Sequence, residues 1–173
     1  YSSDKKLSFG PKFGVNSPLF EHHTNSLVFN DPPLHTRVRK IMTRALNPRS
    51  IKLMEPGLRK TISRLLADIS EKNIKNNEID IIEDFASQIP IQIIGDLLGI
   101  PFQERAPLRD WSLAILGALE PVVNDKEMQI GNEAVAEFKS YLRTLVARRR
   151  REGRDPDTDV LTRLILAEDA EEL

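Results

Sequence analysis

A chain of 173 residues is long enough for a single domain with a real hydrophobic core. Its formal net charge of -1 excludes a globally basic protein that coats a polyanion, and its lack of cysteine excludes disulfides, thiolate nucleophiles and thiolate metal ligands within this sequence. No apolar run approaches the roughly 20 residues of a membrane span. The sequence opens at Tyr1 without an initiator methionine or a signal-like segment, so we expect a cytoplasmic piece of a longer protein.

The first thirty residues are expected to form a long loop. Glycine, proline, asparagine and serine recur there, and neither a helical nor a strand period emerges. Loops of this length in compact domains are usually functional or disordered. The scattered apolar residues favour a loop that packs on the rest of the chain: Phe9, Phe13, Leu19 and Phe20.

The clearest helix signal follows, from Pro32 to Leu46. Asp31 is a candidate N-cap for the first free amide groups, and proline is tolerated at the next positions. Asn47-Pro48 ends the helix. One apolar face is marked at helical spacing by Leu34, Val38, Ile41 and Met42.

The rest of the chain is also expected to be helical. The further helices cover residues 50–69, 84–98, 107–119, 133–151 and 157–167. Pro56-Gly57 should kink the first of these near its start. Residues 78–82 are the one candidate strand, because isoleucine recurs there and is β-branched. The fold class is therefore mainly α, with at most one short strand.

The helix over residues 32–46 carries a cationic pair. His35 and Arg39 lie four residues apart, so they share one helix face. That face adjoins Met42 and Leu46 and should be half buried, and a half-buried arginine needs an anionic partner. Two interpretations stay open at this point: an ordinary intramolecular salt bridge, or an anionic ligand that lies against the helix.

Two further groups of cations have both a structural and a functional interpretation. The far side of the same helix carries a basic stripe, Arg37, Lys40 and Arg44. It is either a solvated face or a docking surface for an acidic partner protein. A denser run, residues 148–151, ends a helix, where the macrodipole favours cations. Contact with nucleic acid is the alternative for that run.

No complete catalytic or metal-binding constellation is visible. The three histidines, His22, His23 and His35, have no carboxylate at ligand spacing, so no metal site is expected. Neither a glycine-rich phosphate loop nor a nucleophile elbow is present. The residues alone therefore indicate a helical body that binds a ligand.

One stretch resembles the C-helix signature of bacterial-type cytochrome P450 monooxygenases: FNDPPLHTRVRK at residues 29–40, followed by ALNPR at residues 45–49. The flanks agree in order, because residues 84–101 resemble helix E and its exit and residues 148–164 resemble the passage from helix G to helix H. The resemblance implies a partial P450 fold, helices C to H, truncated before helix I. Residues 1–173 would be one incomplete domain, with 1–30 as the B–C loop region and 31–173 as the helical body.

The resemblance implies roles for individual positions. His35 and Arg39 match the two residues that bind the haem propionates. The basic stripe matches the proximal surface where a ferredoxin- or flavodoxin-type electron donor docks. Two sets match regions that line the distal substrate pocket: Phe13, Val15 and Leu19 in the loop, and Leu113, Leu116 and Leu119 in the later helix.

The resemblance also implies an activity for the parent protein. With haem b as cofactor, it would insert one oxygen atom from O2 into a small or medium apolar organic substrate. The axial cysteine of the family is absent, so we expect no catalytic residue and no activity in this chain alone. No nucleic acid or membrane is expected as a partner. A haem-free helical ligand-binding or regulatory module is the alternative function.

Overall fold

The computed structural model describes residues 2–76 and 78–169, apart from the side chains of residues 45, 49, 50 and 72–76. Within this range the chain is helical and contains no β-strand, which confirms the mainly α class. No helix in the described part is both long and apolar enough to cross a membrane. The α-helices are α1 (Lys6–Phe13), α2 (Pro18–Asn25), α3 (Leu34–Ala45), α4 (Pro48–Asn76), α5 (Gln88–Leu97), α6 (Ala106–Gly117), α7 (Asp125–Glu152) and α8 (Val160–Asp169). Three shorter helical turns join them: η1 (Leu27–Phe29), η2 (Ile82–Ala86) and η3 (Phe102–Glu104).

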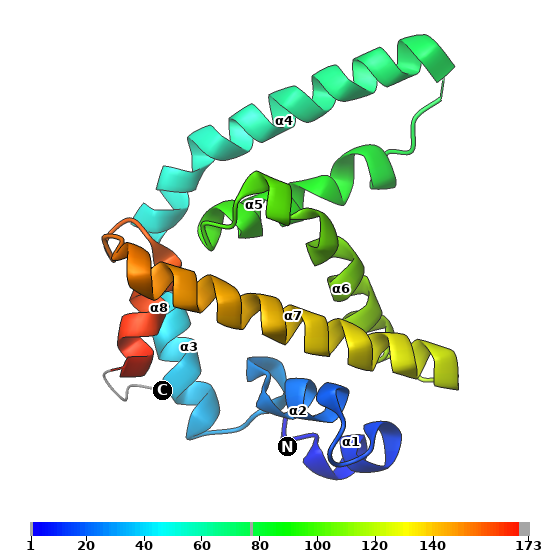
Figure 1. Cartoon of the computed structure of the whole chain (residues 1–173), viewed down its shortest axis with the longest axis vertical. Coiled ribbons are helices and arrows are strands. Elements are labelled where there is room, and N and C mark those ends of the chain that lie inside the picture. The colour runs from blue at the N-terminus through cyan, green and yellow to red at the C-terminus, as the bar shows by residue number, and fades with distance from the viewer. Residues whose placement is uncertain (1, 77, 170–173) are drawn as a thin grey trace.

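Helix α7 is the organising element of the fold. It runs across the molecule and packs against α2, α6 and α8 (Figure 1). Its start is well defined, because Asn124 and Glu127 form a reciprocal capping box. It ends at Gly153, which adopts the left-handed conformation that a helix C-terminus commonly needs (φ 60°).

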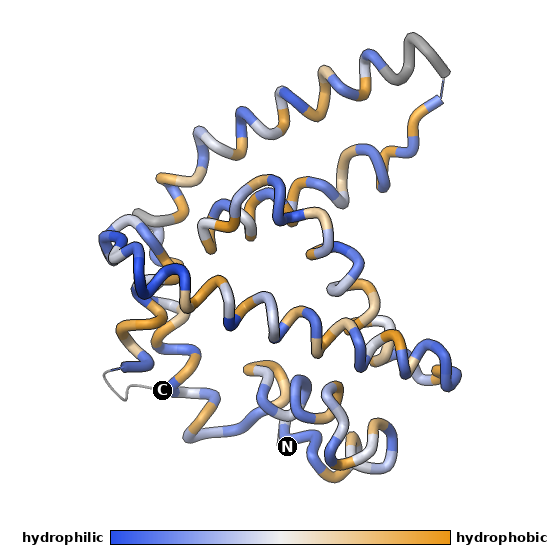
Figure 2. The backbone as a smooth tube through the Cα atoms, viewed as in Figure 1, coloured by the Kyte–Doolittle hydropathy of each residue, from blue (hydrophilic) through white to orange (hydrophobic). Residues whose placement is uncertain are grey.

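Two apolar clusters lie along α7. Apolar residues recur along all the helices (Figure 2). The first cluster joins the N-terminal helices to α6 and the first half of α7 through Phe13, Leu19, Ile115, Ala118, Ala134 and Val135. The second joins the α5–α6 region to the second half of α7 and to α8 through Ile100, Leu108, Leu145, Leu161 and Ile165. Trp111 and Phe138 touch both clusters, so the core is continuous.

The first thirty residues are not the single long loop that we predicted. Two short helices, α1 and α2, form there and are followed by η1. Ser17 caps α2, because its hydroxyl accepts a hydrogen bond from the amide of Phe20 at 3.1 Å, and Pro18 occupies the first helical position. Each helix has only eight residues, so no helical period accumulates over a window of 11 to 18 residues.

Asp31 does not cap α3 as predicted. Helix α3 begins after Pro33, with no side-chain cap. The Asp31 carboxylate instead accepts hydrogen bonds from the Ser2 hydroxyl (2.5 Å) and from the Ser3 amide (2.9 Å), and these bonds hold the pKa of Asp31 below its ordinary value. Asp31 therefore ties the start of the chain to the segment that leads into α3.

The candidate strand at residues 78–82 is also wrong. Residues 78–80 are irregular, and the single π-helical turn η2 follows. The Asp80 carboxylate accepts hydrogen bonds from the amides of Ile82 (2.9 Å) and Glu83 (3.0 Å). This local capping overrides the strand preference of the isoleucines.

Helix α4 is longer than predicted. It starts at Pro48 and stays helical across Pro56-Gly57 to Asn76. It extends along the edge of the molecule beside α5 and η2 (Figure 1). Several of its apolar side chains are exposed, namely Ile51, Leu53 and Leu66.

Candidate functional site

Helix α3 presents the predicted cationic pair one turn apart. His35 is half-buried, as expected, whereas Arg39 is exposed, so the prediction of half-burial is wrong for Arg39. The difference arises because Met42 and Leu46, which were expected to cover this face, are themselves exposed. Ile41 is the buried anchor of α3, on another side of the helix.

Neither member of this pair has a partner within the described part of the chain. The Arg39 guanidinium and the His35 imidazole take part in no side-chain hydrogen bond and no ion pair there. The intramolecular salt bridge is therefore not supported. A guanidinium offers five N–H donors and an imidazole at least one, and both suit an anion such as a carboxylate or a phosphate.

The members of the basic stripe on the far side of α3 differ in their contacts. Arg37 and Lys40 are exposed and make no ion pair with a described residue. Arg44 is tied into the fold, because its carbonyl accepts hydrogen bonds from Asn47 Nδ2 (2.9 Å) and from Arg163 Nη1 (3.3 Å). Arg37 and Lys40 are thus the members best placed to meet a partner protein.

The arginine run at the end of α7 begins with a compact polar network. Arg148 binds both carboxylate oxygens of Glu104, at 2.7 and 2.8 Å, and the Tyr141 hydroxyl donates to the same carboxylate at 2.8 Å. The hydrogen bonds from Arg148 and Tyr141 lower the pKa of Glu104 to about 2. Burial, together with the bond to Glu104, raises the pKa of Tyr141 to about 12.

Arg149 is the buried centre of the same run, with 2% of its surface exposed. It forms an ion pair with Asp159 and donates to the carbonyls of Leu98 (3.1 Å) and Gly99 (3.0 Å) beyond the end of α5. Asp159 also accepts from the Thr162 amide at 2.7 Å, which caps α8. Arg149 and Asp159 therefore clamp α5, α7 and α8 together.

Most of the run is used inside the fold. Arg150 completes it with an ion pair to Asp169 at 2.6 Å, so three of the four arginines have carboxylate partners. This arrangement favours a structural role over contact with nucleic acid. The sequence predicts that the helix macrodipole favours these cations, and the structure adds ion pairs with carboxylates from other segments.

The six predicted pocket residues fall into two groups. Phe13 and Leu19 are buried in the first core cluster, and Leu119 packs against it. Phe13 and Leu19 thus contribute to the hydrophobic core, and their predicted role in a substrate pocket stays a prediction. Val15, Leu113 and Leu116 are more than half exposed. Leu113 borders a cavity of about 240 Å³ between α6 and the start of α7.

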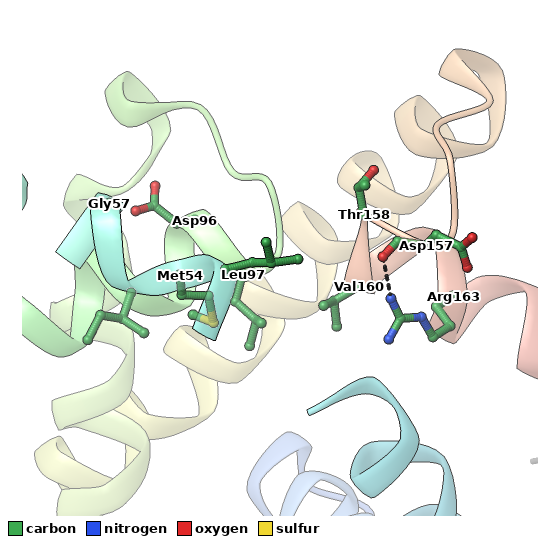
Figure 3. Close-up of a pocket in the computed structure, with 10 residues that line it drawn as sticks. Met54, Gly57, Asp96, Leu97, Asp157, Thr158, Val160 and Arg163 are labelled. Carbon is green, nitrogen blue, oxygen red and sulfur yellow. Dashed lines mark hydrogen bonds between the residues drawn. The ribbon is translucent and has the colours of Figure 1, made fainter. Parts of the chain in front are cut away.

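A second cavity, of about 290 Å³, was not anticipated from the sequence (Figure 3). Its walls come from α4, α5 and the segment around the start of α8, which are far apart in sequence. Met54, Leu97 and Val160 give it apolar walls. Arg163 at its edge donates to the carbonyls of Pro156 (2.9 Å) and Asp157 (3.1 Å), so its guanidinium is engaged by backbone oxygens.

The histidines are not gathered into one site. His22 and His23 are neighbours on α2, with ring centroids 5.0 Å apart, whereas His35 lies on α3. Among the described residues, no three or more His, Asp or Glu side chains are placed to hold a metal ion. His23 is buried in an aromatic cluster instead.

No family model matches the chain. It is 29% identical over 171 residues to cytochrome P450 CYP107DY1 of Priestia megaterium. That match covers 98% of this chain and 39% of CYP107DY1. It is 30% identical over 146 residues to the polyketide biosynthesis cytochrome P450 PksS of Bacillus subtilis, covering 84% of this chain and 33% of that protein.

The architecture is similar to that of solved cytochromes P450. The structure of the cytochrome P450 enzyme CxnD, for C–S bond formation in chuangxinmycin biosynthesis, superposes with a TM-score of 0.74 at 28% identity. That match covers 99% of this chain and 39% of CxnD. The chain thus spans about a third to two fifths of the length of the proteins it matches.

Proposed function

This chain is a homologue of bacterial cytochromes P450 with the helical part of their fold, and we propose that it contributes the haem-propionate anchor of a haem-thiolate monooxygenase. The observation that carries the proposal is the pair His35 and Arg39, one turn apart on α3 and without partners among the described residues. A propionate is the kind of anion that such a pair suits.

The residues present fit this part of haem. Arg39 offers an exposed guanidinium that needs no intramolecular bond to be broken before it binds a carboxylate. His35 offers a half-buried imidazole on the same face, so both donors would hold and orient haem b at its carboxylate edge. When bound, haem supplies the iron chemistry that activates O2.

The axial thiolate cannot come from this sequence, because it contains no cysteine. The chain alone would therefore be inactive as a monooxygenase. In the parent protein, one oxygen atom from O2 would enter a small or medium apolar organic substrate. The name of PksS, which refers to polyketide biosynthesis, is compatible with that substrate class. We expect the parent protein in the cytoplasm.

The basic stripe has a role in the same proposal. Arg37 and Lys40 would meet an acidic ferredoxin- or flavodoxin-type electron donor, because exposed cations without partners can steer and hold an acidic protein. Arg44 is the third member of the proposed docking surface, and its backbone carbonyl is bound by Asn47 and Arg163. The six predicted pocket residues would lie on the substrate side, three of them more than half exposed: Val15, Leu113 and Leu116.

A titration of the chain with ferric haem tests the anchor. We expect the substitution Arg39→Gln to weaken haem binding about tenfold, the equivalent of about 1.4 kcal/mol for lost charge-assisted hydrogen bonds. The matched control is Arg151→Gln, an exposed arginine without a carboxylate partner among the described residues. Equal haem affinities of the wild-type chain and both variants would show that Arg39 does not bind a haem propionate.

A carbon monoxide difference spectrum tests the inactivity of the chain alone. With haem added, we expect no thiolate-type Soret band, because no cysteine can provide the ligand. A thiolate-type band from the purified chain would contradict this part of the proposal.

A haem-free ligand-binding module is the second candidate. It is favoured by a cavity of about 260 Å³ between α5, α6 and α7, whose walls are almost entirely apolar. Such a module would unfold in one cooperative transition and would have no haem affinity. The haem titration therefore separates the two functions.

A further inference from the structure

His23 on α2 is the most deeply buried titratable side chain in the N-terminal part of the molecule, with 2% of its surface exposed. Its imidazole lies in a box of three aromatic rings, with centroid distances of 5.8 Å to Phe9, 5.2 Å to Phe13 and 5.9 Å to Phe29. These rings come from α1 and η1. His23 is therefore the point at which α1, α2 and η1 pack on one another.

Among the described residues, no hydrogen-bond acceptor or anion lies where it could stabilise a positive charge on the His23 imidazole. Its Nε2 atom is buried and finds no hydrogen-bond partner in the described structure. The charged and titratable groups that face it are Lys12 on α1 and His22 on α2, with Lys139 of α7 acting on His22. All of these are cations or can become cations, so a proton on His23 would meet repulsion and no anion.

The other contacts that hold this part of the chain do not titrate near neutral pH. Lys12 Nζ donates to the carbonyl of Glu120 at 2.6 Å, which joins α1 to the α6–α7 connection. Lys139 pairs with Glu21 at 2.7 Å and holds the pKa of Glu21 below its ordinary value. Between pH 5 and pH 8 the histidines are thus the groups whose charge changes.

We propose that His23 is a pH-sensitive lock, which holds α1, α2 and η1 against α6 and α7 while its imidazole is neutral and releases them when it is protonated. A neutral ring packs in the aromatic box as an apolar group does. A protonated ring is costly to bury, so it must leave the aromatic box to become hydrated, and the three phenylalanine rings then lose their central packing partner. This inference does not depend on the haem anchor, because it rests on the contacts of His23 and not on His35 or Arg39.

The direction and size of the effect follow from proton linkage. Burial, followed by the nearby positive charges, lowers the pKa of His23 from 6.5 to about 4. In the open form, in which α1, α2 and η1 are released, His23 binds a proton more readily than in the closed form. The closed form is therefore fully favoured above pH 6.5 and becomes less stable relative to the open form as the pH falls towards 4. When the pH falls from 8 to 5, the equilibrium constant for opening should increase on the order of 30-fold.

Amide hydrogen exchange of the whole chain tests the lock, with rates corrected for the intrinsic effect of pH. The amides of α1 and α2 should lose protection on the order of 30-fold between pH 8 and pH 5. Amides in the second half of α7 should stay protected, which distinguishes local opening from acid unfolding. Protection of α1 and α2 that does not change with pH would overturn the proposal.

Two variants and one spectroscopic titration assign the effect to His23. His23→Phe keeps an aromatic ring in the box and should abolish the pH dependence, whereas His22→Gln should retain most of it. If His23→Phe fails to fold, the proton resonance of the His23 ring in the wild-type chain remains decisive. An inflection near pH 4 supports the lock, and an inflection near pH 6.5 contradicts it.

Discussion

Helix α3 and the end of α7 both carry clusters of cations, and the two clusters differ in what surrounds them. On α3, the side chains of Arg37, Arg39 and Lys40 lack carboxylate partners among the described residues. At the end of α7, the first three arginines of the run each pair with a carboxylate from another segment. The fold therefore satisfies one cluster and leaves the other available to ligands.

The paired arginines of α7 should contribute to stability, whereas the cations of α3 that lack partners among the described residues should contribute to binding. A buried ion pair such as Arg149–Asp159 has a large desolvation cost, so removal of Asp159 leaves a buried charge whose remaining carboxylate contact is the longer one to Glu152 at 3.5 Å. An exposed cation without partners contributes little to folding, and its loss should be felt only by whatever binds it. The following substitutions test this division.

The largest effect is expected at the buried end of α7. Asp159→Ala leaves Arg149 buried without its carboxylate and removes the cap of α8, so the free energy of unfolding should fall by about 3–5 kcal/mol. Urea denaturation measures it. As a matched control, Arg150→Gln breaks an exposed ion pair and should leave the midpoint almost unchanged. Similar losses for both variants would contradict the clamp.

A second test concerns the backbone beside the same clamp. Gly99 has a φ of 62°, and a Cβ built on it would lie 2.6 Å from Arg149 Nη2. Gly99→Ala should therefore destabilise the fold by about 2 kcal/mol, from backbone strain and displacement of Arg149. The control is Gly117→Ala on α6, which has open space around its Cβ and should be neutral or stabilising.

The Glu104 network should show its contribution in the pH dependence. Its pKa of about 2 lies below the ordinary value of 4.5, so its stabilisation is complete above pH 4.5 and is lost as the pH falls towards 2. Because Glu104 and Arg148 are about one-third exposed, solvent screening limits the total to about 1 kcal/mol. Glu104→Gln should flatten the stability profile over this range. An unchanged profile would show that the carboxylate contributes nothing.

The smallest effect on stability is expected on α3. Arg39→Gln and Arg37→Gln should each change the free energy of unfolding by no more than about 0.5 kcal/mol, because neither side chain has a partner to lose among the described residues. A loss of more than about 1 kcal/mol in thermal or urea denaturation would mean that α3 is a structural cluster like the end of α7.

The features that the sequence predicted correctly are those that local periodicity determines. The 3.6-residue period placed His35 and Arg39 on one face of a helix. It also identified the amphipathic helix over residues 133–151, which the structure extends back to Asp125, where the capping box of Asn124 and Glu127 starts α7. Local competition explains part of what was missed. Asp80 caps a turn where isoleucine suggested a strand, and Asp31 binds Ser2 and Ser3 where a helix cap was expected.

Other features depend on tertiary packing and could not be predicted from one sequence. Arg149 looks like its neighbours in the run, and only its partners Asp159 and Leu98 distinguish it as buried. The sequence indicated that Phe13 and Leu19 pack on the rest of the chain, but it could not show that they pack against α6 and α7. The cavity beside Arg163 likewise needs three distant segments to meet.

The central claim is that the cations of α3 bind the carboxylates of haem. The most direct measurement compares the affinities of the chain and of Arg39→Gln for haem and for its dimethyl ester, in which both propionates are neutral. The account predicts that Arg39→Gln weakens binding of haem about tenfold and leaves binding of the ester unchanged. An equal loss for haem and for the ester would show that Arg39 does not act through the propionates and would contradict the account.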